Sequence, residues 1–186
     1  MRARKTQATD AMIVTGGAGF IGSNFVRTAL AKTAARVVVL DALTYAGNLE
    51  SLEAVARDPR FVFLRADITD PEAMRKAVPE AADALINFAA ETHVDRSILG
   101  PLAFVRTNVF GTQVLLDVAR EKKIRRFVQI STDEVYGSLL PGEPPFAEDH
   151  PLAPSSPYAA SKAGADPLVL AAHHTYGQNV GITRCS

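Results

Sequence analysis

Gly16-Gly17-Ala18-Gly19-Phe20-Ile21-Gly22 follows directly on the apolar run 11–15 and is the stretch that decides the fold. Gly16, Gly19 and Gly22 are spaced three apart. Where a strand turns into a helix, the first glycine permits the sharp turn, the second lets backbone N–H groups approach a pyrophosphate, and the third lets the helix pack on the strand. A tight turn alone explains the same pattern, so the surrounding sequence has to support a phosphate-binding loop.

Apolar runs rich in Val, Ile, Leu and Phe recur along the chain, and they predict strands at 11–15, 36–40, 61–65, 84–88, 127–130 and 180–183. They are nearly continuous rather than alternating, which is typical of strands buried on both faces of a parallel sheet. The segments between them predict helices at 21–32, 48–58, 71–77, 101–122 and 157–176. This alternation predicts an α/β fold with a doubly wound parallel sheet of the Rossmann type, about six to seven strands and helices on both faces.

The 186 residues, of which 47% are hydrophobic, suffice for one domain. We expect residues 1–10 to be a disordered lead-in and 11–186 to form the nucleotide-binding domain. The proline-rich segment 138–156 is too long for a simple connector and predicts a functional loop. Pro167 lies well inside the helix predicted at 157–176, where an interior proline predicts a kink.

The charge balance limits the kinds of partner, and the cysteine content limits the cellular compartment. Lys plus Arg equals Asp plus Glu, 20 of each, which favours neither nucleic acid nor a membrane surface as a partner. No apolar window is long enough for a membrane-spanning helix. Cys185 is the single cysteine, which excludes a disulfide within the chain and favours a reducing compartment, the cytoplasm. We predict no metal site.

Asp41 ends the second predicted strand, about 20 residues beyond the glycines, where a carboxylate can accept hydrogen bonds from ribose hydroxyls. It favours NAD over NADP, because a 2′-phosphate would meet like charge and no arginine stands in residues 41–48. A helix cap or turn residue is the alternative interpretation of Asp41. Asp67 and Ile68 follow the third strand, and Phe88 to Ala90 follow the fourth, so all these positions lie at the edge where open α/β sheets bind ligands.

Tyr158 and Lys162 are four residues apart in a predicted helix, which places both on one face. An adjacent ammonium and the positive nicotinamide ring would lower a tyrosine pKa from about 10 and make it a usable base. Thr132, Asp133 and Glu134 follow the fifth strand and offer a hydroxyl, an acid and a base at the same edge. Taken singly, the first pair is also explained by a solvated helix face and the second by a polar strand end.

In combination these motifs resemble the dTDP-glucose 4,6-dehydratases, of the NAD-dependent nucleotide-sugar epimerase and dehydratase group. The resemblance covers nearly all of the chain after residue 10. It is carried by the glycine loop and by the segments 41–48, 89–98, 131–137, 156–164 and 183–186. Its most specific parts are Thr132-Asp133-Glu134 and the run from His93 to Ser97. Related UDP-sugar 4-epimerases usually carry small residues where Asp133 and Glu134 stand.

The resemblance implies a reaction that starts when Tyr158, assisted by Lys162 and Thr132, takes the proton of the sugar 4-hydroxyl while hydride passes to NAD. Glu134 then acts as the base at carbon 5 and Asp133 as the acid at the departing 6-hydroxyl. Hydride returns to carbon 6, so NAD is a bound cofactor.

The resemblance also implies ligand contacts. His93 is equally explained as a loop histidine with its hydrogen bonds satisfied. We predict substrate contacts from Glu91, Thr92, His93 and Thr132. We predict cofactor contacts from Gly16, Gly19, Phe20, Ile21, Gly22, Asp41, Leu43, Thr44, Gly47, Asp67, Ile68, Phe88, Ala89, Ala90, Thr107, Tyr158, Lys162 and Cys185.

The family carries a further C-terminal region that completes the sugar pocket, and this chain stops at Ser186, where that region is expected to begin. Two alternatives therefore stay open beside the dehydratase: a UDP-sugar 4-epimerase or decarboxylase, and a catalytically silent NAD-binding module. The resemblance further implies a homodimer formed through the helices 101–122 and 157–176.

Overall fold

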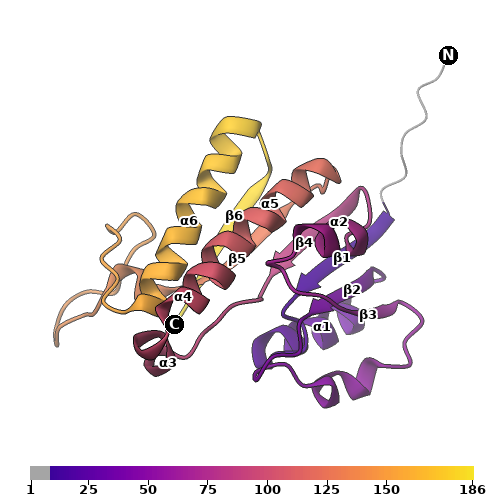
Figure 1. Ribbon diagram of the computed structural model, residues 1–186, viewed down its shortest axis with the longest axis horizontal. Helices are drawn as coiled ribbons and strands as arrows, with labels where there is room; N and C mark the ends of the chain where they lie inside the picture. Colours follow the sequence, from indigo (N-terminus) through magenta and orange to yellow (C-terminus); the bar gives the residue numbers. More distant parts are fainter. Residues whose placement is uncertain (1–8) are drawn as a thin grey trace.

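Six parallel strands form the centre of the molecule (Figure 1). The computed structural model describes residues 9–186. Its strands are β1 (Thr9–Thr15), β2 (Arg36–Asp41), β3 (Phe61–Arg65), β4 (Ala82–Asn87), β5 (Phe127–Thr132) and β6 (Val180–Cys185). All neighbouring pairs are parallel, as the nearly continuous apolar runs predict. The six predicted strands are confirmed.

The strand order is β3-β2-β1-β4-β5-β6. The chain therefore winds outward from β1 in one direction and, from β4, in the other. Such a reversal leaves a crevice at the carboxyl ends of the two central strands, which is the usual ligand site of this architecture. The predicted doubly wound sheet is confirmed.

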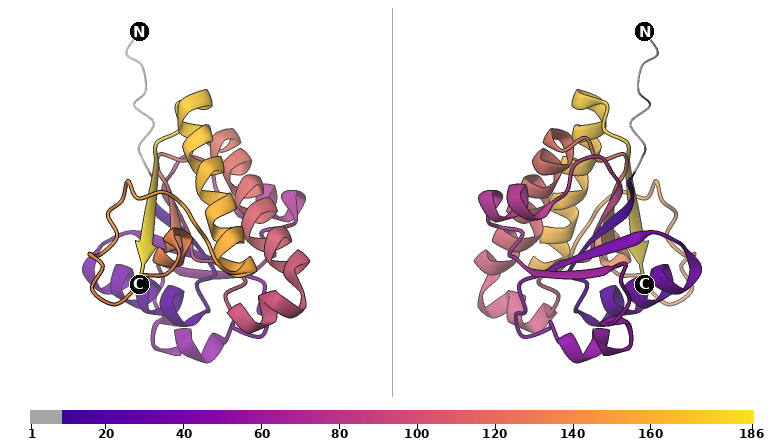
Figure 2. Two further views of the ribbon diagram at one scale, coloured as in Figure 1. Left: turned by 90° about the vertical axis from the view of Figure 1, so that its left-hand side faces the viewer. Right: turned by 90° about the vertical axis from the view of Figure 1, so that its right-hand side faces the viewer.

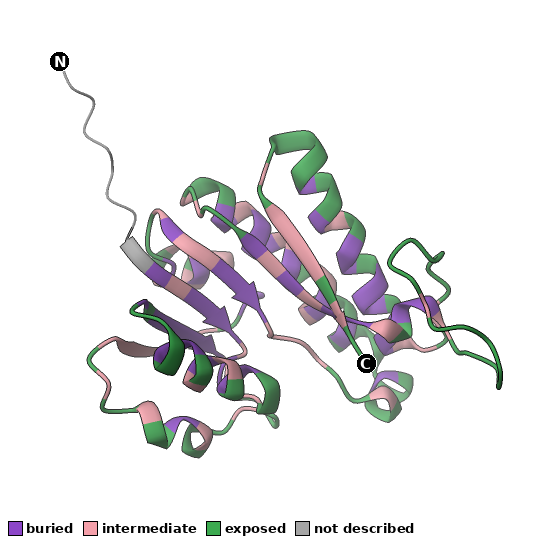
Figure 3. Cartoon of the chain, turned by 180° about the vertical axis from the view of Figure 1, so that it is seen from behind, coloured by how far each residue is buried: buried purple, intermediate pink, exposed green. Residues whose placement is uncertain are grey.

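Helices cover both faces of the sheet (Figure 2). On one face α2 (Pro71–Ala77), α5 (Gly111–Glu121) and α6 (Pro157–Tyr176) bury a core that includes Leu85, Leu115 and Phe127. On the other face α1 (Phe20–Lys32) and the 3-10 helix η1 (Leu49–Val55) pack over β2, β1 and β4. The residues of β6 stay partly exposed at the sheet edge (Figure 3).

Three helical details differ from the sequence-based expectation. The helix predicted at 48–58 is the shorter 3-10 helix η1, which begins after Asn48 caps the N–H of Glu50. The helix predicted at 101–122 consists of α4 (Pro101–Phe104), the π-helical turn η2 (Val105–Phe110) and α5. Short helices at α3 (Val94–Leu99) and η3 (Asp133–Tyr136) were not predicted, because so few residues carry no readable periodicity.

One boundary also needs correction. Strand β1 already begins at Thr9, so the expected lead-in 1–10 is too long, and residues 1–8 lie outside the described part of the chain. Helix α6 has the predicted bounds and continues through the exposed Pro167, and the kink expected there stays a prediction. Among residues 9–186, no helix has the length and apolar character needed to cross a membrane.

Candidate active site

A cavity of about 690 Å³ lies at the carboxyl ends of the strands. The loops after β1, β2, β3, β4 and β5 line it, together with α6 and the end of β6. Nearly all of the predicted ligand contacts lie on its wall. These are Gly16, Gly19, Phe20, Ile21, Gly22, Asp41, Thr44, Gly47, Asp67, Ile68, Phe88, Ala89, Ala90, Glu91, Thr92, His93, Thr107, Thr132, Tyr158, Lys162 and Cys185.

The glycine loop is shaped by close backbone approach. Gly16 has φ +67°, and a Cβ there would lie 2.5 Å from the backbone N of Ala89. A Cβ on Gly22 would overlap the carbonyl oxygen of Gly16. Helix α1 begins after Gly19, which offers no side-chain cap, whereas Asp70 and Ser156 cap α2 and α6. The first-turn N–H groups of α1 are thus left for an anion at the cavity wall.

Asp41 fastens two loops to each other. Its carboxylate is buried, with Oδ2 accepting from the N–H of Ala18 at 2.9 Å and Oδ1 from the N–H of Leu43 at 2.8 Å. Asp41 therefore has the turn-stabilising role of the alternative interpretation and also lines the cavity, where its remaining lone pairs can meet a ribose. Leu43 is not brought to the cavity wall; its side chain packs on the core that contains Leu52.

Tyr158 and Lys162 lie on one side of α6 and are both buried, with exposed fractions of 8% and 4%. Lys162 Nζ donates to the carbonyl oxygen of Ile130 at 2.5 Å. Burial lowers the pKa of this lysine to about 8. Burial and the charge of Glu134 raise the pKa of Tyr158, while a hydrogen bond with Thr132 lowers it in part. The chain by itself thus raises the tyrosine pKa, and the lowering expected from the ammonium together with the nicotinamide ring stays a prediction for the NAD-bound protein.

The polar triplet after β5 lies beside this pair. Thr132 Oγ1 accepts from the N–H of Glu134 at 3.3 Å and so begins the short helix η3. Glu134 is exposed and, with Asp133, acts electrostatically on Tyr158. Asp133 lines a neighbouring cavity of about 510 Å³, and Glu134 lines neither cavity. The structure therefore places Thr132, Tyr158 and Lys162 on the wall of the cavity of about 690 Å³, whereas Asp133 and Glu134 lie off that wall and act on Tyr158 electrostatically.

The loop after β4 is held in place by Asn108, in the π-helical turn. The side chain of Asn108 accepts from the N–H of Glu91 at 2.8 Å and donates to the Glu91 carbonyl at 2.9 Å. It also donates to Ser161 Oγ at 2.8 Å, and Ser161 bonds the carbonyl of Tyr158. Asn108 thereby connects the predicted substrate segment to helix α6. Because π-helical turns often occur at functional sites, this turn is the structural feature that draws attention to Asn108.

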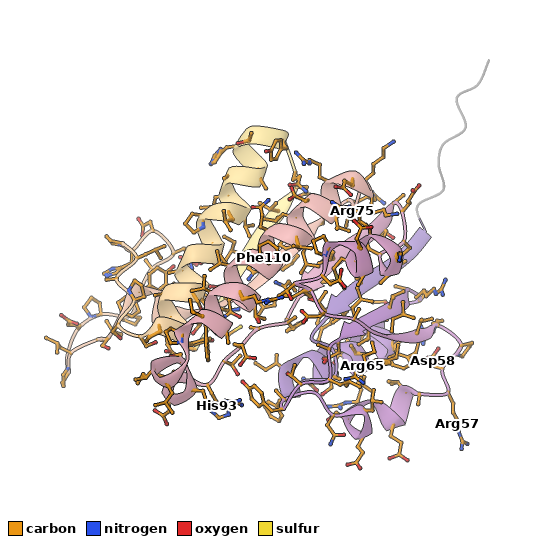
Figure 4. All side chains as sticks on the ribbon, viewed as in Figure 1. Arg57, Asp58, Arg65, Arg75, His93 and Phe110 are labelled. Carbon is orange, nitrogen blue, oxygen red and sulfur yellow. The ribbon has the colours of Figure 1, made fainter. Side chains whose placement is uncertain are left out.

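Tyr45 is a cavity residue that the sequence did not single out. Its ring centroid lies 5.7 Å from that of His93, and the Arg96 guanidinium stacks over it at 3.9 Å. Figure 4 shows His93 at the start of α3, toward the connection after β2. These contacts join loops from the two halves of the sheet. Leu40, Ala42, Ala46, Ala66, Ile130, Ser131 and Ser186 also line the cavity without having been predicted.

The family model described as GDP-mannose 4,6 dehydratase matches residues 13–186. The chain belongs to this family. The resemblance to nucleotide-sugar dehydratases is thereby confirmed. The glycine loop and the Tyr158/Lys162 pair of α6 both lie within the matched residues.

Individual relatives fall within the same group. A dTDP-glucose 4,6-dehydratase from Actinoplanes sp. is 52% identical over 181 residues, covering 94% of this chain and 56% of the relative. A solved dTDP-glucose 4,6-dehydratase from Streptomyces venezuelae, with NAD bound, superposes with a TM-score of 0.89 at 52% identity, over 94% of this chain and 55% of the other. A UDP-Glc/GlcNAc 4-epimerase from Campylobacter jejuni superposes with a TM-score of 0.85 at 31% identity, over 94% and 52%. The chain spans about half the length of these relatives.

Proposed function

We propose that this chain carries the cofactor and catalytic groups of an NAD-dependent dTDP-glucose 4,6-dehydratase. The observation that supports this most strongly is that Thr132 and Tyr158 line the same cavity as the glycine loop, with Glu134 and Asp133 within electrostatic range of Tyr158. Relatives at about 50% identity that carry the dehydratase name support the same activity.

NAD fits the residues that line the cavity. The uncapped first turn of α1 and the close-packed Gly16 and Gly22 suit a pyrophosphate, and Asp41 suits an unphosphorylated ribose. Lys162 and Tyr158 line the same cavity and would face the reacting ring and the sugar. Bound there, NAD would supply reversible hydride transfer, from carbon 4 of the sugar and back to carbon 6.

The side chains supply the proton transfers. Tyr158 acts as the phenolate, which the buried ammonium of Lys162 stabilises and whose pKa Thr132 lowers; it takes the proton of the 4-hydroxyl and becomes a neutral phenol. The new ketone acidifies the proton on carbon 5, which Glu134 removes. Asp133 gives a proton to the 6-hydroxyl, which leaves as water. Glu91, Thr92 and His93 line the cavity near these groups and are proposed to hold the sugar.

A product assay and a carboxylate variant test this proposal. The purified chain is titrated with NAD and with dTDP-glucose, and the 4-keto-6-deoxy sugar is detected by its absorbance in alkali. Glu134→Gln is expected to oxidise the sugar but to stall before elimination, so that the near-ultraviolet absorbance of reduced nicotinamide persists. Glu53→Gln, an exposed residue of η1, is the matched control and should behave as the parent chain.

Two outcomes would overturn the proposal. An epimerised sugar, with no alkali-absorbing product, would indicate a UDP-sugar epimerase. Binding of NAD without binding of dTDP would support the silent NAD-binding module.

We also propose that two copies associate through the outer faces of α4, η2, α5 and α6. Large apolar side chains stay exposed there, notably Leu102 at 81%, Val105 at 50%, Phe110 at 49% and Leu170 at 46%. Phe110 lies on this helical face in Figure 4. Side chains of this kind are typical of a surface that another subunit covers.

Light scattering after size-exclusion chromatography tests the dimer. The parent chain is expected at twice 19.9 kDa, and Phe110→Glu at the monomer mass. Leu140→Glu, exposed at 68% but on the segment 138–156, is the control and should leave the dimer intact. A parent chain that runs as a monomer contradicts this proposal.

We propose the cytoplasm as the compartment, since the exposed, unpaired thiol of Cys185 is compatible with reducing surroundings. Fractionation of cells expressing the native gene, with the protein recovered in the cytoplasmic fraction, is the corresponding check.

A further inference from the structure

A buried ion pair lies behind the catalytic lysine. Asp166 is fully buried on α6, and its Oδ2 accepts from Arg184 Nε at 3.1 Å and lies 3.0 Å from Arg184 Nη2. Its other oxygen, Oδ1, has no hydrogen-bond partner among the described residues, and the same holds for the buried hydroxyl of Ser131. That hydroxyl is near enough to lower the pKa of Asp166, although burial raises the pKa overall. Burying a charge costs free energy unless the charge is paired, so the burial of the Asp166 carboxylate with one unpaired oxygen requires a physical explanation.

Asp166 stands one helical turn after Lys162, the spacing at which side chains meet on one helix face. Its negative charge raises the pKa of Lys162 and so opposes the effect of burial. Cys185 acts on the lysine in the same direction, but less strongly. Asp166 and Cys185 are the charged or titratable groups that act on the lysine, Glu134 and Asp133 of η3 act on Tyr158, one helical turn before it, and Arg184 of β6 is paired with Asp166.

Arg184 is held by more than Asp166. Its Nη1 donates to the hydroxyl of Tyr136 at 2.5 Å and to the carbonyl of Glu148 at 3.3 Å, and its guanidinium stacks 4.9 Å from the Tyr136 ring centroid. The arginine is therefore placed by β6, by η3 and by the loop 138–156 together. A guanidinium fixed on three sides cannot easily leave the carboxylate that it neutralises.

We propose that Asp166 is a positioning residue for the catalytic pair: it keeps Lys162 protonated beside Tyr158, and Arg184 keeps Asp166 ionised. A buried ammonium is stabilised by a negative charge nearby, and a carboxylate on the cavity wall would compete with the substrate for it. Asp166 is buried one helical turn from Lys162 and off the cavity wall, which meets both requirements. The consequence for turnover rests on the proposed dehydratase function, whereas the charge state of Lys162 belongs to the folded chain alone.

The charge state can be measured directly by NMR with ¹³C label at the lysine Cε atoms. In the parent chain one lysine should titrate far below the exposed ones, and Lys162→Arg identifies its signal. In Asp166→Asn we expect the pKa of Lys162 to fall further, by about one pKa unit or more. Asp117→Asn, in which an exposed carboxylate paired to Arg120 is neutralised, is the control and should leave the Lys162 titration unchanged. An unchanged Lys162 pKa in Asp166→Asn overturns the proposal.

A second measurement needs no variant and so does not depend on how Asp166→Asn folds. The ¹³Cγ shift of Asp166 in the parent chain should be that of a carboxylate at pH 7, and a protonated carboxyl there would overturn the proposal as well.

Where the protein turns over, Asp166→Asn should move the basic limb of the kcat profile toward lower pH, with KM unchanged. A lower melting temperature with an unmoved pH profile would show that Asp166 is merely structural. Failure of the parent chain to turn over would count against the proposed function, and the two NMR results would still decide this inference.

Discussion

Replacing Lys162 should make the folded chain more stable at neutral pH and should remove a specific pH dependence. Burial lowers the pKa of this lysine from 10.5 to about 8. Below pH 8 the ammonium is charged in the folded and in the unfolded state, so the folded state carries the whole cost of burying it. At about 1.4 kcal/mol per pKa unit, the difference corresponds to about 3 kcal/mol.

Between pH 8 and 10.5 the folded chain has released this proton, while the unfolded chain still binds it. The free energy of unfolding therefore rises with pH across this window, because the unfolded state binds more protons. Tyr158 does not oppose the rise there, since its raised pKa affects stability only above about pH 10. In Lys162→Met the rise is absent, and the variant is more stable than the parent at pH 7 by up to about 3 kcal/mol.

Urea unfolding followed by circular dichroism at several pH values between 7 and 10 measures both effects. Lys76→Met, at an exposed position of α2, is the control and should keep the pH dependence of the parent. Two results would refute the reasoning that burial lowers the pKa of Lys162. One is an equal rise of the unfolding free energy with pH in the parent chain and in Lys162→Met; the other is a Lys162→Met chain that is less stable than the parent at pH 7.

Three further predictions follow from individual contacts. Gly22→Ala should abolish NAD binding in calorimetry and lower the unfolding free energy, because its Cβ overlaps the carbonyl of Gly16; normal binding would count against the proposed loop. Asn108→Ala removes three hydrogen bonds and should cost about 3 kcal/mol at about 1 kcal/mol each, with faster amide exchange at Glu91; unchanged exchange would contradict the connection. Leu115→Ala should cost about 2–5 kcal/mol in urea unfolding, since the side chain is fully buried; a cost below about 1 kcal/mol would mean that the core repacks there.

The strands and the glycine loop were predictable because their signals are local. Continuous apolar runs bury both faces of a parallel strand, and the glycines are required by backbone approach at the turn, as the position of Gly16 against Ala89 shows. The helices with a proline or a side-chain cap at the first turn, such as α2 and α6, were also predictable. Short helices and the π turn were not, because α3 and η2 are only six residues long and depend on tertiary contacts.

What the sequence by itself determined is the set of chemical groups: a phosphate-binding loop, an acid at the end of β2, a Tyr/Lys pair on one helix and a polar triplet that begins with the last residue of β5. Each is a pattern within a few residues, so no fold is needed to recognise it. Only the tertiary structure decided which of these groups meet and in what electrostatic state. Burial lowers the pKa of Lys162 and raises that of Tyr158. Asp166 pairs with Arg184, which lies 18 residues later in the chain. Desolvation and long-range pairing depend on packing, which no local pattern records.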